Sequence, residues 1–244
     1  MADYGLYFLI TLVLSTFFAM GGVGSAVALL PMLDMLGIPL NLAKATALFV
    51  NTSTTLTATF MNFKRGVLEL RFALPLVVSS LVTAPLGVAA SRYVDDDTVR
   101  FILMIFLIIS ASLILFSNKK AVLVYKARWV MYAVGAVVGF ISGVLGIGGG
   151  SLVMPIMILL GFDVKKMAVA VSFMVSLVTL SAFISYATFV QIDMLLLLFC
   201  GSAAVLGGYL GNHIMHYKLS SHHIKKIIGV ILYVLAFKIG VDLI

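Results

Sequence analysis

The 244-residue chain is 63% hydrophobic and only 10% charged, and its mean hydropathy is +1.21. Soluble domains carry about 25% charged residues, so this composition predicts a polytopic membrane protein without a soluble domain. The net charge of +7 comes from Lys and Arg in short loops at segment ends, which indicates membrane topology and argues against a nucleic-acid partner.

Eight apolar blocks are long enough to cross a bilayer, which takes about 20 residues each. The first block has no basic region and no cleavage site before it, so we expect it to remain as a membrane segment. The single cysteine, Cys200, lies within a block and is expected to be a small buried side chain. The blocks cover roughly residues 5–33, 43–62, 72–90, 99–117, 129–160, 167–190, 194–212 and 224–241.

Two of these blocks are interrupted by glycines. The stretch Gly139–Pro155, GFISGVLGIGGGSLVMP, holds six glycines, and Phe17–Pro31 is a weaker copy of it. Glycine is a poor helix former, so both blocks should break, and a break at membrane depth is tolerated only inside protein or beside a water-filled cavity. Paired interruptions of this kind predict the binding site of a transporter.

The interruptions belong to a longer internal repeat. Aligning Pro31 with Pro155 also aligns Gly22 with Gly146 and Gly24 with Gly148. Further matches pair residues 36–37 with 160–161, 43–47 with 168–172 and 86–87 with 210–211. The sequence therefore predicts two transmembrane repeats, 1–120 and 121–244, joined by a basic linker within one membrane domain.

Basic loop residues, which concentrate on the cytoplasmic side, favour one topology. If all eight blocks crossed the membrane, the Lys and Arg would divide 8 to 8; if blocks one and five are re-entrant hairpins, they divide 12 to 4. Each half then has three crossings, which inverts the second half and brings the glycine tips together near the midplane. The predicted fold class is an all-α polytopic membrane protein with two inverted repeats, each with a glycine-broken re-entrant helical hairpin plus about three transmembrane helices, and with both termini extracytoplasmic.

A short helix should begin after each glycine tip, at about 25–35 and 151–160. Helix starts present unpaired N–H groups and a partial positive charge, so two of them facing one cavity make an anion site. The alternatives are that the glycines only allow close helix packing and that the serines only cap helices. The substrate-binding candidates at the tips are Gly22, Gly24, Ser25, Gly146, Gly148, Gly149, Gly150 and Ser151.

Hydroxyl-rich faces occur inside blocks two and six. Such groups can replace water around a desolvated oxyanion, or they can form helix-to-helix hydrogen bonds worth about 1 kcal/mol each. Asn51 and Ser176 are the preferred ligands because they align across the repeat. The full set of candidates on these faces is Asn51, Thr52, Thr55, Ser172, Ser176 and Thr179.

The sequence contains few candidate residues for catalysis, proton coupling or metal binding. There is no H-E-x-x-H pair, no nucleotide-binding P-loop and no Asp or Glu deep in an apolar block, so we expect no enzyme and no cofactor. For the same reason we expect uniport or channel-like passage rather than proton coupling. Lys238 should reach the membrane surface by snorkelling. Four histidines near a basic loop lack convergent carboxylates or cysteines, so no metal is expected; they are His213, His216, His222 and His223.

The glycine motifs give a family resemblance. GVLGIGGGSLVMP at 143–155, GGVGSAVALLP at 21–31, and the alanine-rich pieces at 43–47 and 168–172 resemble the sulfite exporter TauE/SafE family of TSUP membrane permeases. The first copy departs from the second, with Ser25 and Ala26 in place of Gly149 and Gly150. The resemblance implies export of sulfite or an organosulfonate across a bacterial or archaeal inner membrane.

The predicted function is therefore a permease that moves a small sulfur-containing oxyanion by alternating access at a midplane site. Its expected partners are the anionic substrate and the lipid bilayer, and a homodimer is compatible with the sequence. Two alternatives stay open: an uncoupled anion channel, and a non-transporting anion sensor or subunit of a membrane complex.

Overall fold

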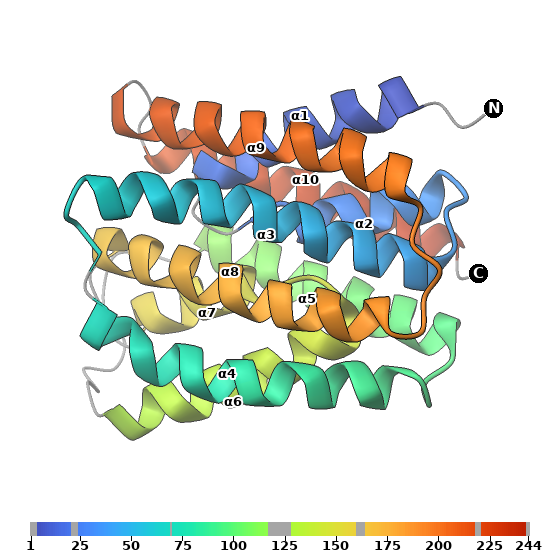
Figure 1. Cartoon of the computed structure of the whole chain (residues 1–244), viewed down its shortest axis with the longest axis horizontal. Helices are drawn as coiled ribbons and strands as arrows, with labels where there is room; N and C mark the ends of the chain where they lie inside the picture. Colours follow the sequence, from blue (N-terminus) through green and yellow to red (C-terminus); the bar gives the residue numbers. More distant parts are fainter. Residues whose placement is uncertain are drawn as a thin grey trace.

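The computed structural model describes residues 4–20, 24–68, 70–116, 128–159, 164–217 and 221–242, and within them the chain forms helices without strands. Figure 1 shows the helices side by side as a bundle with nearly aligned axes. They are α1 (Tyr4–Met20), α2 (Ala26–Met35), α3 (Leu40–Lys64), α4 (Leu70–Ser91), α5 (Asp96–Phe116), α6 (Arg128–Leu145), α7 (Gly150–Leu159), α8 (Val164–Ala187), α9 (Met194–Tyr217) and α10 (Ser221–Asp242).

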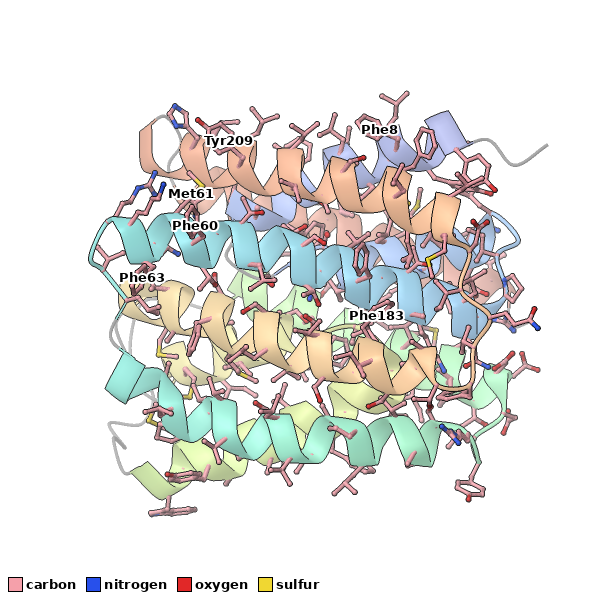
Figure 2. All side chains as sticks on the ribbon, viewed as in Figure 1. Phe8, Phe60, Met61, Phe63, Phe183 and Tyr209 are labelled. Carbon is pink, nitrogen blue, oxygen red and sulfur yellow. The ribbon has the colours of Figure 1, made fainter. Side chains whose placement is uncertain are left out.

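The all-α polytopic prediction is confirmed. Three helices of the described chain contain spans long and apolar enough to cross a bilayer: Ala73–Ser91, Val169–Ala187 and Met194–Ile214. Shorter apolar segments lie at Tyr4–Met20, Ala26–Met35, Trp129–Leu145 and Gly229–Val241. Large apolar side chains also face outward, as expected for contact with lipid tails. Phe60 and Phe63, 58% and 64% exposed, lie at one end of α3 in Figure 2.

Apolar blocks one and five each form two helices, as the glycines predict. The first break separates α1 from α2, and the second, Gly146–Gly149, separates α6 from α7. In Figure 1 α1 begins on the right and α2 runs back toward the right, so the chain reverses at the first break. The predicted short helices begin within one residue of their expected starts, at Ala26 and Gly150.

Two of the six glycines in the second motif pack helices together instead of breaking one. Gly143 was counted among the residues that break block five, but it lies inside α6, where an added Cβ would overlap the carbonyl oxygen of Ala84 in α4. Gly139 of α6 likewise faces Ser80 and Thr83 of α4. The packing interpretation is therefore correct for these two glycines, which allow the two backbones to approach closely.

The two predicted halves interdigitate. The helix α1 packs along α9, α6 packs along α4, and α3 packs against both α8 and α9. Exchanging the first five helices for the last five, in order, converts the α1–α9 pair into α6–α4 and the α3–α9 pair into α8–α4, and both of these pairs occur. The division near residue 120 and the inversion of one half stay predictions.

Candidate substrate site at the paired helix breaks

Asn51 lies near the middle of α3 and contacts both helix breaks. It is fully buried. A Cβ added to Gly24 would overlap its side-chain Oδ1, and a Cβ added to Gly148 would overlap its Nδ2. Both glycines have positive φ, 80° and 79°, which glycine adopts without the cost that other residues incur. The two breaks therefore meet at one amide, with its oxygen toward the first break and its nitrogen toward the second.

Hydrogen-bond donors without partners gather around the second break. Within the described residues, Nδ2 of Asn51 and the hydroxyl groups of Ser142 and Ser151 are buried and have no hydrogen-bond partner. Ser142 is beside Gly149, and Ser151 lies in the first turn of α7. A buried donor left unpaired costs about 1–3 kcal/mol, so an occupant that accepts hydrogen bonds would be favoured here.

The backbone of the second break requires glycine. Gly146, Gly148 and Gly149 have φ values of 74°, 79° and 63°, a left-handed region that costs a residue with a side chain roughly 1–2 kcal/mol. The N–H of Gly150 donates to the carbonyl oxygen of Gly148, and α7 begins there. The first break is described from Gly24 onward, and the candidate Gly22 lies outside the described residues.

The side chain of Ser25 does not cap α2, which was one of the roles expected for it. It occupies the N-cap position of α2, but its side chain makes no cap bond. Its hydroxyl instead lies 3.0 Å from that of Ser15, to which the hydroxyl of Thr54 donates at 3.3 Å. This buried chain of hydroxyl groups joins α1, α2 and α3, so Ser25 connects the first hairpin to the helix that carries Asn51.

Three of the hydroxyl candidates already donate hydrogen bonds within the protein. Thr52 donates to Thr179 at 2.8 Å, which is a helix-to-helix bond between α3 and α8. Thr55 donates to the carbonyl oxygen of Asn51 at 2.7 Å. Ser176, preferred because it aligns with Asn51, donates to Phe173 of its own helix at 2.8 Å. The hydroxyl hydrogens of these three candidates are therefore engaged within the protein.

The structure brings Thr179 of α8 to the second break. Its methyl group, rather than an atom of Ser176, is among the three nearest neighbours of a Cβ added to Gly148. Ser172 is buried about two turns nearer the start of the same helix. Of the candidates on the two polar faces, Asn51 and Thr179 are thus among the nearest neighbours of Gly148.

Lys44 is a residue beside the second break that the sequence patterns do not indicate. Its place at the edge of block two resembles that of a loop charge, yet Lys44 is 1% exposed and lies within α3. A Cβ added to Gly146 would meet its aliphatic stem, and its Nζ is 6.0 Å from the ring centroid of Tyr186. Its spacing of seven residues from Asn51, which places both on nearly the same helix face, is the signal that could have found it.

The histidines give no metal site in the described part of the chain. No group of three or more His, Cys, Asp or Glu side chains gathers there. His213 stacks on Tyr209 of the same helix, with ring centroids 6.1 Å apart. The side chains of His216, His222 and His223 lie outside the described set.

The fold and the site define a class: a polytopic helical membrane protein whose broken helices meet at a buried polar centre, as in membrane transporters. The model of the sulfite exporter TauE/SafE family matches residues 7–239, so the chain belongs to that family. It is accordingly a membrane transporter.

Three relatives support this class. The probable membrane transporter protein YunE of Bacillus subtilis is 27% identical over 241 residues, covering 86% of this chain and 88% of the relative. YdhB, a probable membrane transporter of the same organism, is 24% identical over 84% of this chain and 85% of its own length. MJ0441 of Methanocaldococcus jannaschii, also a probable membrane transporter, is 28% identical over 68% of this chain and 66% of its own length. No solved structure matches.

Proposed function

We propose that this protein is a permease that exports a small sulfur-containing oxyanion, sulfite or an organosulfonate, across a bacterial or archaeal inner membrane. The observation that carries the proposal is the unpartnered Nδ2 of Asn51, buried between Gly24 and Gly148. Sulfite and sulfonates have acceptor oxygens for that N–H and for the unpartnered hydroxyl groups of Ser142 and Ser151. The family supports a sulfur oxyanion over other small anions.

The start of α7 also favours an anion. Its N–H groups and the positive end of the helix favour negative charge close to the amide of Asn51, which packs against Gly148. The site would thus bind the anion through neutral donors. Such donors satisfy oxygen atoms whether they belong to sulfite or to a sulfonate group.

Alternating access follows from the predicted inversion of the two halves. In that arrangement one hairpin enters from each side of the membrane, and both tips touch the same amide of Asn51. Withdrawing either tip would open the amide to one side while the other tip keeps it closed. Both termini would be extracytoplasmic in this arrangement.

Binding can be tested by thermal shift of the purified full chain with sulfite, methanesulfonate, sulfate, phosphate and chloride. A ligand that binds only the folded protein raises its melting temperature, so we expect selective stabilisation by sulfite or methanesulfonate. Asn51→Ala should abolish the shift. Thr57→Val is the matched control, because Thr57 is on the same helix and donates only to the carbonyl oxygen of Ser53. No response of the wild type, or an equal response of Asn51→Ala, would refute the proposed site.

Transport is tested in liposomes that contain only this chain. Saturable sulfite flux with counterflow is expected of an alternating-access carrier. Flux without counterflow would favour the channel, and binding without flux would favour the sensor or complex subunit.

A further inference from the structure

Lys44 stands out in the described structure as the one buried residue that carries a formal charge. A cation inside a membrane protein is expensive, and such residues pair with a counter-ion or line the pathway of a substrate. The position of Lys44, 1% exposed within α3, therefore requires a partner for its ammonium group.

No carboxylate of the described residues forms a close ion pair with Lys44, and the charges of Asp34 and Asp96 act on its ammonium group only from a longer distance. The two ion pairs found there both belong to Arg100, which binds Asp34 at 2.9 Å and Asp97 at 3.0 Å. The ring of Tyr186 is the aromatic neighbour of the ammonium group, but at 6.0 Å from the centroid it lies at the outer limit of a cation–π contact. The Tyr186 hydroxyl is itself committed, donating to Ser91 at 3.0 Å.

Lys44 also lies against the same glycine break as Asn51. The stem of Lys44 packs at Gly146, and the amide of Asn51 packs at Gly148. Seven residues separate the two along α3, about 10 Å at 1.5 Å per residue, and both project to nearly the same side. The lysine stem and the unpartnered amide donor therefore lie on the same face of α3, against successive glycines of the break.

We propose that Lys44 binds the anionic substrate at the second break, on the side of Asn51 toward the start of α3, and that its charge makes the pathway selective for anions. This inference rests on the proposed function and adds the residue that neutralises the substrate. The neutral donors around Asn51 would bind any ligand with suitable acceptor oxygens. The ammonium group of Lys44, by contrast, distinguishes a charged sulfonate from an uncharged sulfone.

The test compares methanesulfonate with dimethyl sulfone, a neutral ligand of similar shape, in equilibrium binding to the purified full chain. Wild type should prefer methanesulfonate by tenfold or more, because charge-assisted hydrogen bonds are roughly twice as strong as neutral ones. Lys44→Met should weaken methanesulfonate binding by about tenfold or more and leave dimethyl sulfone binding nearly unchanged. Lys44→Arg, which keeps the charge, should retain most of the preference.

Lys64→Met is the matched control, because it removes a lysine from the exposed end of the same helix. It should bind both ligands as the wild type does. Thermal unfolding without ligand separates binding from folding: Lys44→Met should melt no lower than wild type, since a buried unpaired charge is removed. Lys44→Gln provides a second neutral variant in case Lys44→Met does not fold.

The outcomes separate the inference from the function on which it rests. No methanesulfonate or sulfite binding by wild type would defeat both. Binding by wild type that persists unchanged in the folded neutral variants would defeat the role of Lys44 and leave the proposed function standing. An equal loss in Lys44→Arg and Lys44→Met would show that charge is not what binds the ligand.

Discussion

Gly24 and Gly148, far apart in the sequence, face opposite ends of the side-chain amide of Asn51. An added Cβ at either position would occupy space that the amide already fills. Asn51 of α3 thus contacts both helix breaks. Substitutions at these glycines should therefore destabilise the protein more than backbone strain alone predicts.

We expect Gly148→Ala to lower stability more than Gly37→Ala. Gly37 also has positive φ, 84°, but no atom lies within 4 Å of its added Cβ, so alanine there incurs only the left-handed strain of about 1–2 kcal/mol. Gly148→Ala adds overlap with Asn51, and it should also abolish the thermal shift with sulfite. Melting temperatures of the two purified variants provide the comparison, and equal values would contradict the overlap.

The close approach of α6 to α4 predicts the effect of Gly143→Ala. The new methyl group would overlap the carbonyl oxygen of Ala84, and forcing atoms into a packed interface costs typically 1–3 kcal/mol. Gly5→Ala in α1 meets open space and should not lower the melting temperature. A Gly143→Ala protein as stable as wild type would show that the two helices can separate at little cost.

The ion pair between Arg100 and Asp34 connects the end of α2 to the start of α5, and it should contribute to stability. Arg100 donates to both carboxylate oxygens, through Nε at 2.9 Å and Nη2 at 3.0 Å. A double-mutant cycle with Arg100→Met and Asp34→Asn should give a coupling free energy of about 1 kcal/mol that falls as salt is added.

The cycle has a control within the same cluster. Asp97 also contacts Arg100 at 3.0 Å, but its side chain is 80% exposed against 16% for Asp34. The coupling of Arg100 with Asp97 should therefore be the smaller of the two. A larger value for Asp97 would mean that solvent exposure does not rank these pairs.

Asp95, in the loop before α5, should make stability depend on pH. The backbone N–H of Thr98 donates to its carboxylate at 2.8 Å, as does the Thr98 hydroxyl, and these bonds lower the pKa of Asp95 below its usual value. A carboxyl whose pKa is lower in the folded state stabilises the protein above its unfolded pKa of about 3.9, and this contribution is lost as pH falls through the folded pKa. Asp95→Ala should thus melt lower than wild type at pH 7.

The difference should disappear in acid. Melting curves of wild type and Asp95→Ala should converge as the pH is lowered below about 4. Thr98→Val, which removes only the hydroxyl bond, should show a smaller difference at pH 7. A gap between wild type and Asp95→Ala that persists in acid would assign the effect to packing rather than to the carboxylate.

Several site residues could be inferred from local patterns. Paired glycine runs that interrupt apolar blocks predict Gly148 and Gly149 as site residues, and the alignment of Asn51 with Ser176 across the repeat predicts Asn51. Lys44 was missed because its place at a block edge resembles that of a loop charge. Ser176 was preferred by alignment, but its hydroxyl bonds to its own helix and Thr179 contacts the break.

The sequence by itself determined the helices, the two breaks and the family, because apolar length, glycine propensity and motif spacing are properties of neighbouring residues. Only the tertiary structure decided which polar groups are satisfied and which are available. Thr52 finds Thr179 across the bundle, whereas Nδ2 of Asn51 finds no partner in the described chain. The physical reason is that the partner of a side chain depends on which helices pack together, and the pairs α1–α9 and α4–α6 join segments far apart in the sequence.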